Sequence, residues 1–262
     1  MVLADTHAHL YLEQFDEDRD DMMRRASEAG VERIYLPNVD SRTISAMLAV
    51  EAAYPDRCFA MMGLHPCSVK EDYERELSIV QQWLNERPFC AVGEIGIDLY
   101  WDKTFFEVQK TAFLTQVDWA LEHDLPIVIH ARESLDILIE LLKPIKDRRL
   151  RGIFHCFGGS VEQAEAAISK NFLLGIGGVL TYKKSGLDEV LKHIDLQHLV
   201  LETDSPYLAP APYRGKRNES AWTRIVAERL AEVKQENLEA IAEVTTRNAL
   251  KIFMQKETII SK

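Results

Sequence analysis

The sequence predicts an α/β fold, a (β/α)₈ barrel of the TIM type in which eight parallel strands alternate with helices. Short apolar runs alternate with longer amphipathic segments along most of the 262 residues. The connections between them are short, as in consecutive strand–helix units. In addition, histidines and carboxylates stand at the ends of many apolar runs, and a barrel would bring these ends together at one mouth.

The expected strands are short apolar runs, as is typical of parallel strands buried on both faces. They cover residues 2–6, 31–37, 58–64, 89–97, 126–130, 152–156, 172–177 and 199–203.

The expected helices follow these strands. The long segment 103–123 shows the 3.6-residue apolar spacing of a helix packed on a sheet. Gly30 ends the first helix, and Pro144 stops the fifth. The helices cover residues 15–29, 42–53, 72–85, 103–123, 135–142, 162–169 and 186–193, with extra C-terminal helices at 221–233 and 236–254.

An open doubly wound sheet is the alternative architecture. No Gly-x-Gly-x-x-Gly follows the first strand, and the polar residues end many strands instead of gathering at one crevice. We also find no internal repeat, low-complexity tract or interdomain linker. The prediction is therefore a single domain over residues 1–262, with the proline-rich stretch 206–212 as a loop of the site.

The composition is that of a globular protein with a sizeable core, with 47% hydrophobic and 28% charged residues. No apolar run approaches the roughly 20 residues that span a bilayer. The first residues lack the basic segment and apolar core of a signal peptide, so we expect a cytoplasmic protein without membrane contact. Four cysteines without metal-ligand spacing are expected to be free thiols in a reducing compartment: Cys58, Cys67, Cys90 and Cys156.

The formal net charge of −11 argues against a protein that coats nucleic acid non-specifically. It does not argue against a nuclease, because bound metal ions can neutralise a phosphate locally.

The candidate metal ligands begin at the first strand. His7 and His9 are two residues apart, so in an extended strand they point to one face and can bind one ion. Later strand-like segments also end in a histidine or carboxylate, namely His65, Glu94, His130, His155 and Asp204.

These seven side chains exceed the three or four ligands that one ion normally takes. Two ions about 3.5–4 Å apart, bridged by a carboxylate, fit the number better. Glu94 is the candidate bridge. A carboxylate bridge favours Mg²⁺ or Mn²⁺, whereas the histidines also suit Zn²⁺.

The catalytic candidates come from the same set. Asp204 is expected to bind an ion and to accept the proton of the attacking water. His65 precedes Pro66 and is expected to contact substrate phosphate or to bind metal. Glu202 and Asp5 are expected to orient the ligands, although Glu202 can equally be a structural polar residue. His65 and Glu202 are the alternative proton acceptors.

Basic and aromatic residues in later loops are candidate substrate contacts. Arginine forks match phosphate oxygens and lysine acts as a point charge; these residues are Arg132, Arg214, Lys216 and Arg217. Aromatic rings near the bridging carboxylate could stack on bases; these are Tyr100, Trp101 and Phe105. The alternatives are a solvated loop for the cations and packing into the barrel rim for the rings.

Six short motifs occur in a fixed order, followed by Pro212-Tyr213-Arg214-Gly215-Lys216-Arg217-Asn218. They are Asp5-Thr6-His7-Ala8-His9-Leu10, Gly63-Leu64-His65-Pro66, Gly93-Glu94-Ile95-Gly96-Ile97-Asp98, His130-Ala131-Arg132, His155-Cys156-Phe157-Gly158-Gly159 and Glu202-Thr203-Asp204-Ser205-Pro206-Tyr207. Together they resemble the TatD-type metal-dependent deoxyribonucleases, a branch of the amidohydrolase superfamily. The resemblance runs from residue 5 to Arg247-Asn248-Ala249.

The resemblance implies a (β/α)₈ barrel, two divalent metal ions and hydrolysis of DNA phosphodiester bonds from the 3′ end. The expected partner is therefore DNA, single-stranded or with 3′ ends. The oligomeric state stays open, and a monomer is compatible with the sequence. A rival reading is amide or ester hydrolysis, such as removal of an aminoacyl group from tRNA. A non-enzymatic metal-binding scaffold is disfavoured, because a structural site is normally closed by four ligands.

Overall fold

The computed structural model describes residues 1–253 and confirms the eight predicted strands. Met254, the last residue of the final expected helix, lies outside this range. The strands are β1 (Leu3–Asp5), β2 (Val31–Leu36), β3 (Cys58–Ala60), β4 (Val92–Asp98), β5 (Ile127–Arg132), β6 (Gly152–Phe154), β7 (Phe172–Ile176) and β8 (Leu199–Leu201).

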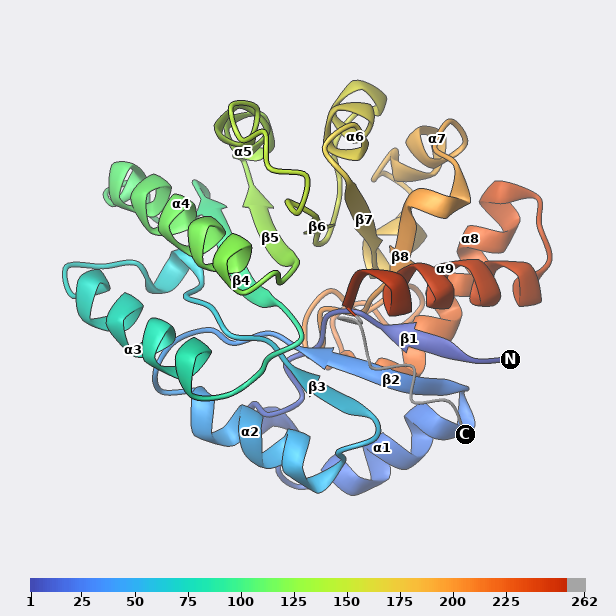
Figure 1. The fold of residues 1–262 in the computed structure, drawn as a ribbon. Coiled ribbons are helices and arrows are strands. Elements are labelled where there is room, and N and C mark those ends of the chain that lie inside the picture. Colours follow the sequence, from blue (N-terminus) through green and yellow to red (C-terminus); the bar gives the residue numbers. More distant parts are fainter. Residues whose placement is uncertain (254–262) are drawn as a thin grey trace, which may run out of the picture.

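All strand pairs are parallel, in the orders β1-β2-β3 and β4-β5-β6-β7-β8. Isolated parallel bridges join the two sheets at both edges. Met62 bridges to Val92 between β3 and β4, and Ala8 bridges to Ser205 between β8 and β1. The Thr6 amide also donates to the Leu201 carbonyl at 2.9 Å. The strands thereby form a ring with the helices outside it (Figure 1).

The helices are α1 (Arg19–Glu28), α2 (Ile44–Ala53), α3 (Tyr73–Glu86), α4 (Phe106–Glu122), α5 (Leu135–Leu142), α6 (Val161–Ile168), α7 (Leu187–Leu191), α8 (Thr223–Lys234) and α9 (Leu238–Phe253). Helices α1 and α4 begin four and three residues later than expected, and the other helices begin within two residues of the expected positions. Residues Glu13–Phe15 form a short 3-10 helix before α1, and the Asp102 carboxylate accepts from the Thr104 amide in a turn before α4.

The buried apolar residues form two layers. A large outer layer lies between strands and helices. A smaller inner cluster fills the barrel, with one residue from each of several strands, for example Ala4, Val128 and Val200. Helix α9 adds Phe253 to this cluster, and its ring stacks on Tyr35 with centroids 3.9 Å apart.

Helix α9 covers the amino ends of the strands. The Asn248 amide donates to the carbonyls of Leu196 and Leu199, where β8 begins. The Thr246 hydroxyl donates to the Val2 carbonyl, just before β1. In Figure 1, α9 lies across the barrel next to β1 and β8. The last C-terminal helix therefore closes one end of the barrel and leaves the carboxyl ends of the strands for the site.

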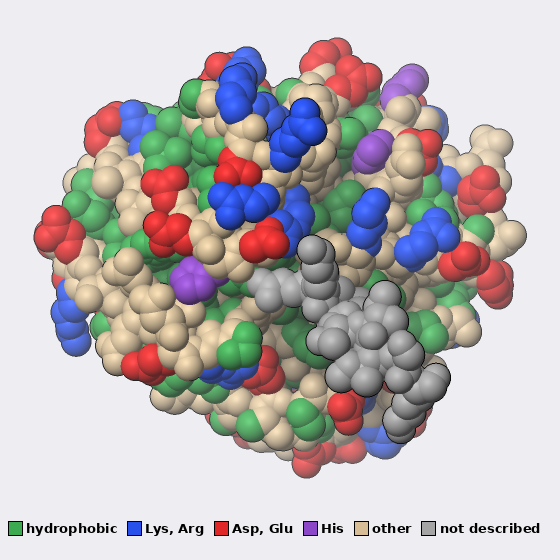
Figure 2. Space-filling model, viewed as in Figure 1, with side chains coloured by type: hydrophobic (Ala, Val, Ile, Leu, Met, Phe, Trp, Pro, Cys, Tyr) green, Lys and Arg blue, Asp and Glu red, His purple; other side chains and the backbone are tan. Residues whose placement is uncertain are grey.

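The face of the molecule seen in Figure 2 carries acidic and basic side chains interspersed with one another, both at its edge and nearer its centre. Within residues 1–253, no helix has the length and apolar character needed to cross a membrane. All four cysteines are free thiols, as expected.

Candidate functional site

The predicted ligands gather at the carboxyl ends of the strands. His7 and His9 follow β1, His65 follows β3, Glu94 lies in β4 and His130 in β5. His155 follows β6 and Asp204 follows β8. Six of these seven side chains line a cavity of about 860 Å³, and His7 lies beneath them, fully buried.

Glu94 lies at the centre of the cluster, and its two carboxylate oxygens face different histidines. Oε2 lies 3.0 Å from His7 Nε2 and 3.6 Å from His9 Nε2. Oε1 lies 2.8 Å from His130 Nδ1 and 3.5 Å from His65 Nε2. One buried carboxylate is thus shared between two groups of imidazoles.

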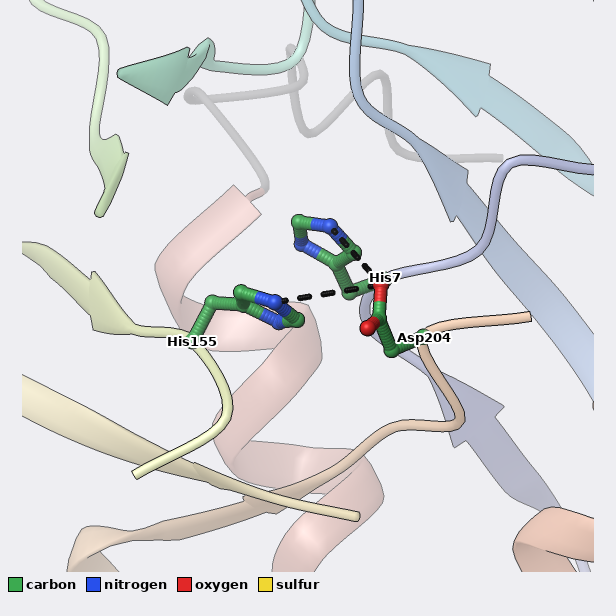
Figure 3. Close-up of side chains that lie close together, drawn as sticks. All are labelled: His7, His155 and Asp204. Atoms are coloured by element: carbon green, nitrogen blue, oxygen red, sulfur yellow. Dashed lines mark ion pairs between the residues drawn. The ribbon is translucent and has the colours of Figure 1, made fainter. Parts of the chain in front are cut away.

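Asp204 faces the same cluster from the opposite side of the ring. Its Oδ1 lies 3.8 Å from His7 Nε2 and 3.9 Å from His155 Nε2 (Figure 3). The two imidazoles stack with centroids 3.5 Å apart and planes 15° from parallel. The Asp204 backbone has a φ of 57°, which aspartate tolerates better than most residues. Its amide donates to the His7 carbonyl at 2.9 Å, which fixes the loop against β1.

The charges of the cluster shift several pKa values. Burial alone would raise the pKa of Glu94, but its electrostatic interactions with His7, His65 and His155 and its hydrogen bond with His130 outweigh burial and hold the pKa well below its usual range. Burial would lower the pKa of His155, but the charges of Glu202 and Glu94 raise it to about 10. Without metal, protons therefore provide the positive charge of this site.

His7 has the opposite shift. Burial lowers its pKa, and the neighbouring His155 charge adds to this effect. Both of its ring nitrogens are buried: Nε2 faces the carboxylates of Glu94 and Asp204, and Nδ1 has no hydrogen-bond partner in the range 1–253. A neutral imidazole with an unshared nitrogen close to two carboxylates is the state in which histidine binds a metal ion.

The donor set fits a divalent metal ion. Within residues 1–253, three groups made only of imidazole nitrogens and carboxylate oxygens have their ligand atoms within 4.8 Å of one another. They are His7, His155 and Asp204; His7, His9 and Glu94; and His65, Glu94 and His130. Mixed nitrogen and oxygen donors of this kind suit zinc, manganese and related ions.

A second layer of carboxylates holds the histidines. His130 Nε2 lies 2.8 Å from Asp98 Oδ2, and His155 Nδ1 lies 2.9 Å from Glu202 Oε1. Gly175 makes room for Glu202, because a Cβ at this position would lie 2.2 Å from Glu202 Oε2. Asp98 was not among the site residues predicted from the sequence. It lies four residues after Glu94 in β4, so the two side chains share one face of the strand.

Asp5 connects the loops that follow β1 and β8, and does not hold a histidine ring. Its Oδ2 accepts hydrogen bonds from the hydroxyls of Thr203 and Ser220, both at 2.6 Å. Its Oδ1 accepts from the amide of His7 at 3.3 Å and from that of Thr203 at 2.9 Å. Burial raises the pKa of this carboxyl to about 7.

His65 differs from the other histidines in its hydrogen bonds. Its Nδ1 accepts from the Cys67 amide at 3.0 Å. The neutral ring therefore carries its proton on Nε2, which lies 3.5 Å from Glu94 Oε1. In this tautomer the ring presents a hydrogen-bond donor to the cavity.

The candidate substrate contacts divide into two groups. Arg132 and Trp101 line the cavity. The Arg132 guanidinium lies 4.1 Å from the Tyr100 ring centroid and 5.7 Å from that of Trp101. Trp101 is 70% exposed, so one side of its ring is open to a ligand.

The remaining candidates do not line this cavity. Arg214 lies over Tyr182 at 4.5 Å and Lys216 over Tyr213 at 5.6 Å. Lys70 lies over Phe105 at 5.0 Å. Arg217 is paired with Asp18 at 2.6 Å and also donates to the Gln14 carbonyl, so its guanidinium holds two segments of the chain together. The cavity has further lining residues that the sequence did not single out, among them Asp40, Arg42 and Tyr207.

Comparison with known proteins identifies the family of this chain. The family described as TatD related DNase matches residues 4–254. An uncharacterized metal-dependent hydrolase, YabD of Bacillus subtilis, is 39% identical over 253 residues, which cover 96% of this chain and 99% of YabD. A protein of Pectobacterium parmentieri named 3′-5′ ssDNA/RNA exonuclease TatD is 29% identical, with 96% and 99% coverage.

Among solved structures, YjjV, a TatD homolog from Escherichia coli K12, superposes with a TM-score of 0.91. It is 33% identical, and the match covers 96% of this chain and 97% of YjjV. The fold agrees with that of these relatives. The chain belongs to the family of TatD-related DNases, whose members include metal-dependent hydrolases and named nucleases.

Proposed function

We propose that this protein is a metal-dependent deoxyribonuclease that hydrolyses phosphodiester bonds of single-stranded DNA from the 3′ end. One observation carries the proposal: the two oxygens of Glu94 face separate groups of histidines. A shared carboxylate of this kind is typical of sites that hold two divalent ions. The relatives named as 3′-5′ ssDNA/RNA exonucleases support the substrate and the polarity.

Two divalent ions, Mg²⁺ or Mn²⁺ with Zn²⁺ as the alternative, are the proposed cofactors. His7 and His9 would hold one ion with Glu94 Oε2, and His130 would hold the other with Glu94 Oε1. His155 and Asp204 lie within 3.9 Å of this cluster's other ligands and would complete the two sets. When bound, such ions supply a water nucleophile at neutral pH and polarise the phosphoryl oxygen.

The side chains of the cavity would do the remaining chemistry. Asp204 is 16% exposed and can accept the proton of an attacking water through its carboxylate. Glu202 is buried and fixes the orientation of His155 through Nδ1. His65 Nε2–H would donate to a non-bridging oxygen of the scissile phosphate. Arg132 would bind phosphate at the rim of the cavity.

The test is a substrate panel with each metal in turn. Purified protein would be incubated with single-stranded DNA labelled at either end, single-stranded RNA, aminoacyl-tRNA and a simple aryl ester. We expect loss of nucleotides from the 3′ end of DNA with Mg²⁺ or Mn²⁺. The Glu94→Gln variant, prepared in parallel, controls for contaminating nucleases and should be inactive. Release of amino acid or ester turnover without DNA cleavage would overturn the proposal in favour of an amide or ester hydrolase.

Metal content tests the two-ion assignment separately. Elemental analysis of the parent should give two ions per chain, and anomalous scattering from a metal-soaked crystal should place Glu94 between them. A single, fully occupied ion without Glu94 among its ligands would contradict the two-ion site.

A further inference from the structure

Arg42 lies at the rim of the cavity and has a fixed orientation. It follows β2, and its side chain is 84% exposed. The side chain of Asp40 beside it is only 4% exposed. Asp40 Oδ1 accepts from Arg42 Nε at 3.1 Å, and Oδ2 accepts from Arg42 Nη2 at 2.6 Å. The Ser68 hydroxyl donates to Asp40 Oδ2 at 2.9 Å, which fixes the carboxylate in turn.

This arrangement leaves donors free for a ligand. A guanidinium carries five N–H donors, and Asp40 uses two of them. Arg42 Nη1 makes no hydrogen bond within the part of the chain that the structure describes. A pre-oriented guanidinium with free N–H groups is well suited to a phosphate, which accepts two parallel hydrogen bonds.

The same local motif occurs a second time and allows a comparison. Arg149 forms a fork with Asp147 at nearly the same distances, 3.1 Å from Nε to Oδ1 and 2.7 Å from Nη2 to Oδ2. This pair lies between α5 and β6, at the amino ends of the strands. The Asp147 side chain is 32% exposed. An Arg–Asp fork alone is therefore no evidence of binding. Arg42 differs from Arg149 because its partner Asp40 is buried and held by Ser68, and because it lines the cavity.

The depth of Arg42 indicates which phosphate it would contact. The candidate metal ligands at the floor have side chains that are at most 17% exposed, whereas Arg42 is largely in solvent. The scissile phosphate has to reach the floor, so a phosphate at the rim must belong to another nucleotide. Arg132 lies at the end of β5, which is not adjacent to β2 in the strand order. It therefore lines a different side of the same cavity.

We propose that Arg42 binds the phosphate of a nucleotide neighbouring the scissile bond and thereby favours oligonucleotides over substrates with a single phosphodiester. This inference rests on the proposed nuclease function and extends it to a second phosphate site. The ligand class is a single-stranded polynucleotide, recognised through its backbone and not its bases.

The experiment compares two substrates and three variants of the full chain with Mn²⁺ or Mg²⁺. The substrates are a labelled single-stranded oligonucleotide and thymidine 5′-p-nitrophenyl phosphate, which has one phosphodiester. We expect Arg42→Ala to lower kcat/KM for the oligonucleotide about 5- to 30-fold, in line with the loss of one charge-assisted phosphate contact. Turnover of the small ester should stay within twofold of the parent. Arg42→Lys should recover part of the loss, because lysine keeps the charge but lacks the fork.

Arg149→Ala is the matched control, since it removes the same fork on the opposite face. It should leave both substrates unaffected. The Arg42→Ala variant should also show a shallower dependence of oligonucleotide affinity on salt, by about one phosphate contact.

The outcomes separate the two proposals. If Arg42→Ala cleaves the oligonucleotide like the parent, or loses both substrates equally, the second phosphate site is wrong and the nuclease function stands. If the parent cleaves neither phosphodiester with any of the metals, the proposed function fails, and the Arg42 inference fails with it.

Discussion

The carboxylate of Asp98 connects the imidazole of His130 to the aromatic loop at the rim of the cavity. Oδ2 lies 2.8 Å from His130 Nε2. Oδ1 accepts from the amides of Tyr100 and Trp101 at 2.9 and 3.1 Å. His130 is thereby oriented with Nδ1 toward Glu94, so the position of a candidate ligand and that of the exposed Trp101 depend on one buried side chain.

Removal of Asp98 should weaken metal binding without removing a ligand. We expect Asp98→Ala to lower metal affinity about 10- to 100-fold, because carboxylates that orient a metal-binding histidine typically contribute this much. Competition with a chelating dye measures the affinity. Excess metal should restore most of the activity. Asp102→Ala, which removes a carboxylate of the same loop that contacts Lys70 and not His130, is the control. Equal affinities in Asp98→Ala and the parent would contradict this role.

Metal binding should release protons. Burial lowers the pKa of His130, but hydrogen bonds to Asp98 and Glu94 outweigh this effect and raise it to about 9, and the pKa of His155 is raised to about 10. Both rings are therefore protonated in the metal-free protein at neutral pH and must lose these protons to bind an ion. Affinity should rise as the pH rises toward 9–10, by about tenfold per pH unit for each proton released. Calorimetry in buffers of different ionisation enthalpy counts the protons, and no release at pH 7 would contradict the assignment.

The roles of Asp204 and His155 can be separated by substitution. Asp204→Asn keeps an oxygen that can bind metal but removes the proton acceptor, so we expect a rate loss of about 10²–10⁴-fold with metal content largely kept. His155→Ala should instead lower metal affinity and be partly rescued by excess ion. Bound metal and cleavage rate across a metal titration distinguish the two. If Asp204→Asn loses its metal and excess ion restores it, Asp204 is only a ligand.

Helix α9 should contribute strongly to stability. Phe253 is 4% exposed and stacks on Tyr35 inside the barrel. Phe253→Ala should lower the free energy of unfolding by about 3 kcal/mol, because it leaves a cavity in a packed core. Urea unfolding followed by circular dichroism measures the change. Arg247→Ala, whose exposed partner is Glu243, should change it by less than about 0.5 kcal/mol. Similar values for both variants would show that α9 packs loosely.

The sequence predicted the fold and the clustering of the candidate metal ligands because both depend on local patterns. Strand periodicity places His7 and His9 on one face, and parallel topology brings every strand end to one mouth. Contacts between distant segments were not predictable in this way. Arg217 was expected at phosphate, yet its guanidinium is paired with Asp18, 199 residues earlier. The orientation of Arg42 depends on the burial of Asp40 and on Ser68, neither of which a local pattern reveals.

The closure of the barrel by α9 also constrains how a polymer can move through the protein. Side chains fill the interior of the barrel, and α9 covers the amino ends of its strands. A polymer therefore cannot pass through the ring of strands. If the protein is the nuclease proposed above, a released nucleotide and the shortened strand would leave through the opening by which the strand entered. Each round of cleavage would then require the product to leave this opening before the next nucleotide reaches the site. For such an enzyme we expect inhibition by its own mononucleotide product and frequent dissociation from long strands.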